Sequence, residues 1–368
     1  MNNKEFVTPY GLFASIVVTV IGVGIFSYPR NMAEAVGTGG WIVTIIGGFL
    51  SYILIHISYK AIKINNFKKF YEIVDDNFGR LIGIVLSLIF VASILASVSL
   101  GMRVFVEVIK MYLLEKTPTE FILIITILTG VYLIRGEIDA LIKFNEISFW
   151  IMFIPIIIVL ILTLNKTDLT NIFPILANKP VEYLKSLKGT VYSFGGLEII
   201  YMLTPFMKDR KKVPRAALKA VGFITAFYIV IVLFTLAIFS KEQSKVLLWP
   251  TITMIQSIYI PGAFIERWEG VVMALWVVFY FTTFSNSYYL CTDIVKDMFR
   301  LQDIKVASVL VAPFVYAIAM YPENIAEIYN ANDNIMPLFS LFILVILPLM
   351  LILVTPLRKG IKRGGSRK

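Results

Sequence analysis

Gly22-Val23-Gly24-Ile25-Phe26-Ser27-Tyr28-Pro29-Arg30 interrupts the first long apolar segment of this chain. Two glycines two positions apart weaken a helix, and Pro29 lacks a backbone N–H donor but suits the first turn of a helix that starts again. Within a bilayer, backbone groups freed by such a break must be satisfied by protein, water or a ligand, because lipid offers no hydrogen-bond partner. The stretch is therefore a candidate binding site.

A second break, Ser193-Phe194-Gly195-Gly196-Leu197-Glu198, interrupts another apolar segment near the middle of the chain. Paired glycine interruptions at corresponding positions of two halves are typical of transporters whose binding site lies between inverted repeats. Glycines can also serve only to let membrane helices pack closely. We favour the first interpretation because the two breaks are matched.

The composition indicates a polytopic membrane protein. Of the 368 residues, 58% are hydrophobic and only 16% are charged, and the mean hydropathy is +0.82. One cysteine, Cys291, and one histidine, His56, exclude a disulfide framework and argue against a His/Cys metal site. The sequence also lacks a cluster of catalytic carboxylates, histidines or cysteines, so we expect neither an enzyme nor a bound cofactor.

The net charge of +10 is explained by membrane topology. The basic residues lie in short clusters between apolar segments and in the tail Arg358 to Lys368. Most of the 34 Lys and Arg residues fall on the side that holds both termini. The positive-inside rule then predicts that both termini are cytoplasmic, and we expect a lipid membrane rather than nucleic acid around these charges.

Ten segments are long and apolar enough to cross a membrane, or nearly so. They lie at 9–35, 39–60, 79–110, 119–135, 145–165, 187–207, 216–240, 268–296, 304–321 and 335–357. The sequence thus predicts an all-α protein with one membrane domain, residues 1–357, and a basic cytoplasmic tail, 358–368. The broken first and sixth spans and the long third and eighth spans occupy equivalent places in two halves, about 9–165 and 187–357. Halves with five spans each have opposite orientations, so the repeat is inverted.

The broken helices suit a zwitterionic ligand. The start of a half-helix exposes N–H groups with partial positive charge, and the end of a half-helix exposes carbonyls with partial negative charge. We expect a ligand carboxylate near the backbone of Gly24, Ile25 and Phe26, and its ammonium near carbonyls around Gly22 and Phe194. The pocket is then shaped by the other residues of the second break, which are Ser193, Gly195, Gly196 and Leu197.

Charged residues inside apolar segments are functional candidates. Glu198 directly follows the second break and can cap the restarting helix or receive a ligand ammonium or a proton; we favour capping with a secondary effect on the site. Arg103 and Glu107 lie on one face of the third span, where they form a structural salt bridge or belong to a functional site. The polar run 282–289 in the eighth span can complete a sodium site, line a water path or make interhelical hydrogen bonds.

With these breaks and this ten-span plan, the chain resembles the B subunit of nutrient germinant receptors of spore-forming bacteria. These endospore germination permeases belong to the amino acid, polyamine and organocation transporter superfamily. The resemblance covers nearly the whole chain, including Phe6 to Arg30 and the basic loop Lys208-Asp209-Arg210-Lys211-Lys212. The Gly-x-Gly-Ile element is specific for the superfamily, whereas the length and the Phe-Gly-Gly-x-Glu element favour the germination family.

The resemblance implies a LeuT-like fold in the inner spore membrane and a small germinant, such as an amino acid, as ligand. It also implies an A subunit and a lipoprotein C subunit as partners. By position, the implied pocket contains Gly24, Ile25, Leu100, Gly196, Leu197, Ser285 and Tyr289. Proton-coupled relatives use a lysine in the fifth span, but Phe149 to Leu164 contains none, which argues against proton coupling.

The sequence therefore predicts a germinant-sensing receptor subunit. In this hypothesis, ligand closure around the two breaks favours one conformation, which the partner subunits detect. The alternative is an ordinary secondary transporter of amino acids.

Overall fold

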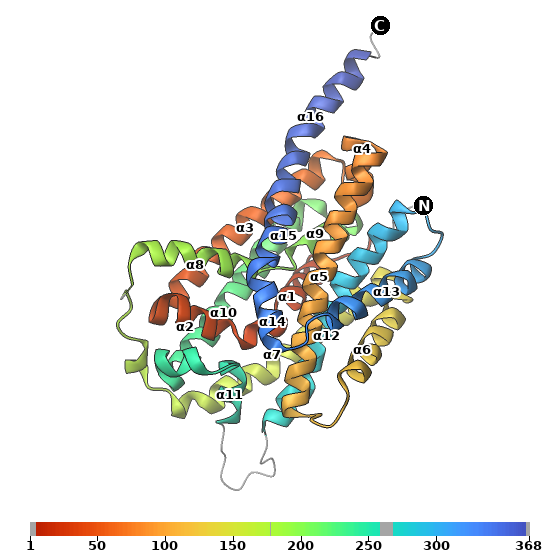
Figure 1. Cartoon of the computed structure of the whole chain (residues 1–368). Coiled ribbons are helices and arrows are strands. Elements are labelled where there is room, and N and C mark those ends of the chain that lie inside the picture. The colour runs from red at the N-terminus through yellow and green to blue at the C-terminus, as the bar shows by residue number, and fades with distance from the viewer. Residues whose placement is uncertain (1–4, 177, 258–267, 366–368) are drawn as a thin grey trace.

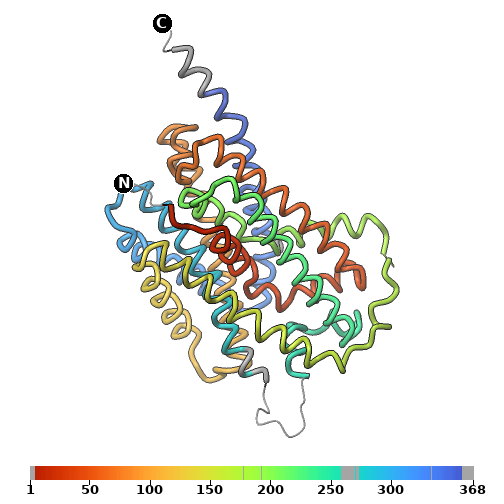
Figure 2. The backbone as a smooth tube through the Cα atoms, turned by 180° about the vertical axis from the view of Figure 1, so that it is seen from behind, coloured from red at the N-terminus to blue at the C-terminus, as the bar shows by residue number. Residues whose placement is uncertain are grey.

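The structure is a computed structural model that describes residues 5–176, 178–257 and 268–365. Over these residues it is helical, apart from one isolated β-bridge between Val7 and Met207. Figure 1 and Figure 2 show a bundle of helices from which α16 (Leu347–Gly365) projects at one end.

The first predicted span is broken at Gly22 and Gly24. It consists of α1 (Pro9–Val20), a 3₁₀ helix (Val23–Phe26) and α2 (Tyr28–Val36), and Pro29 lies in the first turn of α2. The rest of the first half follows the apolar segments, with helices α3 (Gly40–Ile64), α4 (Phe70–Phe78), α5 (Arg80–Tyr112), α6 (Thr119–Ile134) and α7 (Glu137–Thr163). Helix α7 begins before the predicted residue 145, because its first turns are amphipathic: they alternate charged residues with the buried Ile138, Leu141 and Ile142 and so do not form a continuous apolar run.

The second half opens with the second break. Helix α8 (Pro180–Tyr192) ends there, and the chain continues through a 3₁₀ helix (Leu197–Ile199) into α9 (Ile200–Leu203). The remaining elements are α10 (Val213–Val246), α11 (Pro250–Gln256), α12 (Trp268–Met298), α13 (Ile304–Met320), α14 (Ile325–Asn334), α15 (Met336–Leu341), a π-helical turn (Phe342–Ile346) and α16.

The apolar helices make this an integral membrane protein. In the described part of the chain, five helical stretches are long and apolar enough to cross a membrane: Tyr28–Ile64, Arg80–Tyr112, Glu137–Lys166, Arg210–Val246 and Ile325–Arg358. Large apolar side chains also cover the outer surface, as illustrated by Phe49 and Phe314, whose exposed fractions are 64% and 62%. Such a surface suits lipid, which solvates apolar groups but not backbone polar groups.

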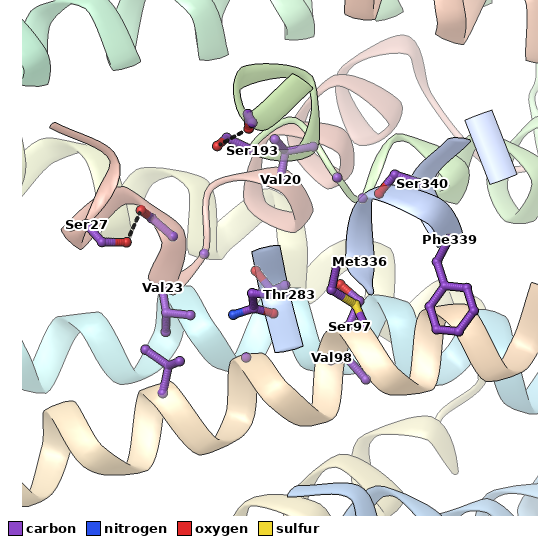
Figure 3. A pocket seen from close by; sticks show the side chains of 18 of the residues that line it. Val20, Val23, Ser27, Ser97, Val98, Ser193, Thr283, Met336, Phe339 and Ser340 are labelled. Atoms are coloured by element: carbon purple, nitrogen blue, oxygen red, sulfur yellow. Dashed lines mark hydrogen bonds between the residues drawn. The ribbon is translucent and has the colours of Figure 1, made fainter. Parts of the chain in front are cut away.

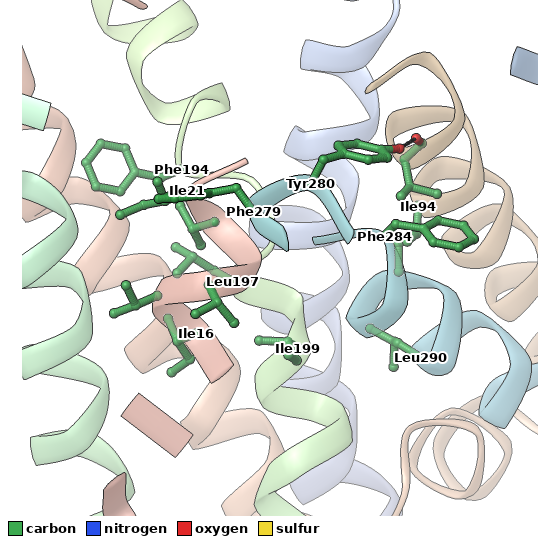
Figure 4. Close-up of a cluster of buried hydrophobic side chains, with 14 of the residues drawn as sticks. Ile16, Ile21, Ile94, Phe194, Leu197, Ile199, Phe279, Tyr280, Phe284 and Leu290 are labelled. Carbon is green, nitrogen blue, oxygen red and sulfur yellow. Dashed lines mark hydrogen bonds between the residues drawn. The ribbon is translucent and has the colours of Figure 1, made fainter. Parts of the chain in front are cut away.

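The interior is formed by helices that the sequence separates widely. Helix α1 packs against α7, α10 and α12, while α12 also packs against α5. Figure 4 shows buried apolar side chains where these helices meet the second break, including Ile16 of α1, Phe279 of α12 and Phe194 of the break itself. The two breaks are therefore held inside the bundle by close packing on several sides.

Short helix α4 lies where residues 67–74 of the sequence can form an interfacial helix, with aromatic and aliphatic side chains against lipid. In the structure, however, Phe70, Ile73 and Val74 are buried in the protein. The Phe70 ring stacks on Phe90 of α5, with ring centroids 4.1 Å apart. The lipid-facing expectation is wrong, because α5 covers the apolar side of α4.

The N-terminal segment closes one end of the bundle. The backbone N–H groups of Phe6 and Val7 both donate to the carbonyl of Phe206 at 3.0 Å, and Lys208 N–H donates to the Val7 carbonyl at 3.1 Å. Beside this pairing, Arg210 forms an ion pair with Glu5 at 2.9 Å. The start of α1 is thus fixed to the segment between α9 and α10.

Candidate ligand-binding site

The first break is a short extended segment that another helix approaches closely. Ile21 and Gly22 leave the helical conformation, with φ/ψ of −83°/85° and −111°/−145°. A Cβ atom at Gly22 would lie only 2.8 Å from the hydroxyl oxygen of Thr283 on α12. A larger residue at this position would push α12 away, so glycine sets the spacing between the break and α12.

The second break depends on the left-handed conformation of Gly196. Its φ is +105°, and a Cβ atom there would lie 3.1 Å from the Thr19 side chain and 3.3 Å from the Thr19 carbonyl oxygen. Only glycine adopts this conformation without strain and leaves room for α1. The second break therefore lies directly against the end of α1, next to the first break.

A cavity of about 540 Å³ lies between the two breaks. Figure 3 shows side chains from both breaks, from α5 and α12, and from the C-terminal segment around it. Its lining includes Gly22, Val23 and Gly24 of the first break and Ser193, Gly195, Gly196 and Glu198 of the second. The start of the 3₁₀ helix at Val23 thus presents its first N–H groups, which have no partner within that helix, at the cavity.

The cavity reaches one end of the molecule. Among its lining residues, Asn31, Glu34 and Ala35 on α2 are exposed, as is Gly189 on α8. The opposite end is closed by the pairing of Val7 with the segment after α9. A ligand therefore has access from the end formed by α2 and α8.

Several carbonyls freed by the breaks are already satisfied by side-chain hydroxyls. Thr283 donates to the Thr19 carbonyl at 3.0 Å, and Thr251 of α11 donates to the Ile25 carbonyl at 2.9 Å. The Tyr228 hydroxyl of α10 lies 3.1 Å from the Ser193 carbonyl and 3.4 Å from the Val20 carbonyl. Tyr228 therefore links the two breaks, and Thr283 of the polar run in α12 makes an interhelical hydrogen bond.

The charged side chains that line the cavity are acidic. Its described lining residues include two carboxylates, Glu34 and Glu198, and no lysine, arginine or histidine. Glu34 pairs with Arg30 at 2.8 Å, whereas no cation of the described chain forms an ion pair with Glu198. One Glu198 carboxylate oxygen accepts a hydrogen bond from Gly196 N–H at 3.0 Å. This bond gives Glu198 the predicted capping role, and the remaining carboxylate capacity suits a ligand cation.

The predicted site residues fall into two groups. Gly22, Gly24, Ser193, Gly195, Gly196 and Glu198 line the cavity. The other predicted residues lie outside the lining: Ile25, Phe26, Leu100, Phe194, Leu197, Ser285 and Tyr289. Their side chains are buried in the surrounding walls, where Phe26 stacks on Trp276 at 3.6 Å between ring centroids and Ser285 donates to the Phe281 carbonyl at 2.7 Å. A direct role for them in ligand binding stays a prediction.

The structure adds lining residues that the sequence did not indicate. They are Ser93 and Ser97 of α5, Tyr228 of α10, Tyr280 of α12, and Asn332, Met336 and Ser340 near the C-terminal segment. Thr283 and Ser287 of the polar run in α12 also line the cavity. The four-residue spacing of Ser93 and Ser97 places both on one face of α5 and is a signal that could have been read. Tyr228 and Asn332 carry no comparable signal, because their place at the cavity depends on how distant helices pack.

Arg103 and Glu107 form the predicted salt bridge at 3.0 Å. The guanidinium also donates to the Glu323 carbonyl at 3.4 Å, and neither residue lines the cavity. The pair therefore connects α5 to the segment after α13.

Comparisons with known proteins agree with this architecture. A family model described as spore germination protein matches residues 6–328. Spore germination protein A2 of Bacillus subtilis is 27% identical over 368 residues, covering 98% of this chain and 99% of that protein.

Two solved transporters share the fold at low sequence identity. A Na⁺-coupled sialic acid symporter in a substrate-bound, outward-open state matches with a TM-score of 0.68 and 14% identity, over 93% of this chain and 80% of the other. Mhp1, a nucleobase-cation-symport-1 family transporter, matches with a TM-score of 0.64 and 13% identity, over 92% and 78% of the two chains. The fold is thus LeuT-like, and the family match excludes an enzyme as the sequence predicts. The chain belongs to the spore germination protein family of permease-like membrane proteins.

Proposed function

We propose that this chain is the germinant-sensing membrane subunit of a spore germination receptor and binds an amino acid between its two helix breaks. The observation that carries the proposal is the cavity of about 540 Å³ that both breaks line. Its size lies in the usual range for small-molecule sites, roughly 300–1,000 Å³. Family membership supports a role in germination, whereas the nature of the ligand rests on the chemistry of the cavity.

That chemistry favours a zwitterion. The N–H groups at the start of the Val23–Phe26 helix suit a carboxylate, because they carry partial positive charge. Glu198 lies at the second break without a cationic partner in the described chain and suits an ammonium group. An α-amino acid carries its ammonium and its carboxylate on the same carbon atom, so one small molecule can contact both breaks.

The proposal includes ten membrane spans in two inverted halves of five. The matched breaks after α1 and α8 support it, as do the long helices α5 and α12, which occupy equivalent positions and pack together. Both termini then lie in the cytoplasm, and the cavity opens away from the cytoplasm. We further propose that the chain lies in the inner membrane of the spore, with its site facing arriving nutrients.

Membership of a germinant receptor family implies other receptor subunits, and we propose an A subunit and a lipoprotein C subunit as partners. Ligand binding would draw the two breaks together and favour a closed conformation, since a ligand shifts an equilibrium only through its different affinity for the two states. The partners would respond to that change.

The proposal is tested by filling the cavity at Gly24. A Cβ at Gly24 would meet no atom within 4 Å, so Gly24→Leu adds bulk to open space rather than to a packed wall. We expect this variant to be produced normally but to abolish germination on one amino acid and binding of that labelled amino acid to purified protein. Gly222→Leu is the matched control, because Gly222 on α10 also faces open space but does not line the cavity. Wild-type germination and binding in the Gly24 variant would refute the proposed site.

A secondary transporter of amino acids is the second candidate, and the two symporters of the same fold favour it. The two functions differ in whether the ligand crosses the membrane. Purified chain in sealed vesicles would accumulate or exchange labelled amino acid if it were a transporter. A receptor subunit would bind the amino acid without net uptake.

A further inference from the structure

A second pocket, of about 690 Å³, lies between the end of α3 and the start of α10. Its lining consists of His56, Tyr59, Lys60, Lys63, Phe67, Arg210, Lys211 and Pro214. None of these residues lines the cavity between the breaks. The pocket is therefore separate from the proposed amino acid site.

This basic pocket, defined by those eight residues, carries unbalanced positive charge. Four of its residues are lysine or arginine, and none is acidic. Lys60, Lys63 and Lys211 are exposed and form no ion pair with a described residue. Glu5 pairs with Arg210 alone, at 2.9 Å. Three lysines thus converge on one hollow without a protein anion, which points to an anion from outside the chain.

Arg210 is held in the pocket with an unused donor. Its guanidinium lies 5.0 Å above the Phe67 ring, and one terminal nitrogen bonds Glu5. Its Nε is buried and has no hydrogen-bond partner. It is one of ten buried side-chain polar atoms without a partner in the described chain, and among them it belongs to a residue that lines the basic pocket, so it can take an acceptor from outside the protein. A phosphate oxygen is a suitable acceptor, because guanidinium and phosphate have matching geometry.

An apolar surface leads to the basic pocket along both helices. On α3, exposed Phe49 and Ile53 precede His56, Lys60 and Lys63 at spacings of three and four residues, which places all five on one helix face. On α10, Leu218 is 50% exposed and follows Pro214 by one turn. The exposed surface of these two helices therefore changes from apolar to basic toward the end of the molecule where the N-terminal segment is fixed.

We propose that the basic pocket binds an anionic phospholipid. The head-group phosphate would contact Lys60, Lys63 and Lys211 and accept from Arg210 Nε, while the acyl chains would lie along Ile53 and Leu218. Basic pockets between membrane helices on the cytoplasmic side are suited to such head groups. A soluble phosphate would use the lysines but would make no use of the exposed apolar side chains beside the pocket. The inference goes beyond the proposed germinant site, and either can fail without the other.

The test compares lipid retention in matched variants. The full chain would be purified in detergent, and phosphatidylglycerol, phosphatidylcholine and inorganic phosphate would be titrated separately by native mass spectrometry and thermal shift. The pocket variant is Lys60→Gln/Lys63→Gln/Lys211→Gln. The control is Lys208→Gln/Lys212→Gln/Lys219→Gln, which removes equal charge from the same end of the molecule without touching the pocket lining.

We expect the wild type and the control to bind phosphatidylglycerol in preference to phosphatidylcholine. The pocket variant should bind phosphatidylglycerol on the order of 100-fold more weakly, because each lysine near an anionic lipid contributes about fivefold. Equal losses in both triple variants would indicate only general surface charge and overturn the proposal. Inorganic phosphate that stabilises the wild type as well as the lipid does, or unchanged lipid binding by a folded pocket variant, would also overturn it.

Discussion

Tyr228 shows how one side chain can join the two halves of the site. Its hydroxyl lies within 3.1 Å of the Ser193 carbonyl and 3.4 Å of the Val20 carbonyl. Tyr228→Phe removes this link but keeps the ring, which packs against Tyr28 with ring centroids 4.7 Å apart. We expect a loss of about 1–2 kcal/mol, because the partly buried Ser193 carbonyl loses its donor, whereas the Val20 carbonyl still accepts from Gly22 N–H at 3.0 Å.

That loss should appear as a lower thermal midpoint of the purified protein and as weaker binding of its amino acid. Tyr59→Phe is the control, since the Tyr59 hydroxyl also donates to a carbonyl, that of Arg210 at 3.1 Å, but lies far from the breaks. If the control weakened amino acid binding as much as Tyr228→Phe, the special role of Tyr228 would be refuted.

Beside α1, which leads into the first break, the buried amides of Asn145 and Asn286 connect three helices. Asn145 of α7 donates to Ser15 at 3.0 Å and to Asn286 of α12 at 2.8 Å, and Asn286 donates to Thr19 at 2.8 Å. Replacing either asparagine by leucine leaves the other with unsatisfied polar groups, which costs about 1–3 kcal/mol. The double variant should lose less stability than the sum of the single variants.

A double-mutant cycle on thermal unfolding in detergent measures this coupling. Additive losses would show that the two amides act independently. The same comparison with Ser93→Ala, whose hydroxyl bonds only within its own helix at 2.6 Å, gives the baseline for a local polar change.

Single residues of the site were predictable where the backbone decides their role. Gly22 and Gly196 are identified by the sequence because a helix break needs glycine, and both line the cavity. Phe194 lies in the same break, yet its side chain is buried away from the cavity. Sequence spacing gives a residue's position along the chain but not the direction of its side chain in an irregular segment.

Among the elements, the N-terminal segment has a definite and testable role. Val7→Pro removes an N–H group that donates to the Phe206 carbonyl at 3.0 Å, whereas Val7→Ala keeps that donor. We expect the proline variant to increase hydrogen exchange at residues 206–208 and at the start of α1. The alanine variant should retain protection there, apart from the effect of a smaller buried side chain.

Equal exchange in the wild type and the proline variant would mean that this pairing does not hold the end closed. A faster exchange in both variants would attribute the closure to the buried Val7 side chain instead of its backbone. The readout is local, so a general loss of folding would be recognised from faster exchange throughout α12.

Elements were predictable to the extent that apolar length decides them. Helices α3, α5 and α13 begin within one residue of their predicted ranges. Helix α8 begins at Pro180, before the predicted residue 187, because its first turns are amphipathic rather than apolar. For α4 the sequence identifies a short helix but not its packing partner, since both lipid and α5 can cover an apolar face.

At the scale of the whole molecule, the proposed orientation can be measured with single cysteines. The native cysteine, Cys291, is buried, so Cys291→Ser gives a background without reactive thiols. Lys185 on α8 and Lys212 before α10 are both exposed. We expect an impermeant thiol reagent to label Lys185→Cys in intact cells and Lys212→Cys only in inverted membranes.

Labelling of both positions from one side would contradict the inverted five-plus-five arrangement, because the two residues then could not lie on opposite sides of the membrane. Labelling in the reverse order would keep the arrangement but reverse its orientation. The unmodified Cys291→Ser protein controls for non-specific labelling.

The overall fold was predictable because the two breaks, the long spans and the charge distribution all indicate one architecture. The LeuT-like fold follows from their combination rather than from any single motif. The access route to the cavity was not predictable, since it depends on which end of the bundle is packed shut. That property belongs to the packing of one conformation and not to any local sequence pattern.

The closed end also affects how often the protein opens in the absence of a ligand. Three backbone hydrogen bonds and one ion pair hold the N-terminal segment against the segment after α9. A motion that opens this end without ligand must break them, and the open population falls about tenfold for each 1.4 kcal/mol that they contribute together. In the receptor that we propose, the strength of this pairing would therefore limit how often a dormant spore germinates without a nutrient.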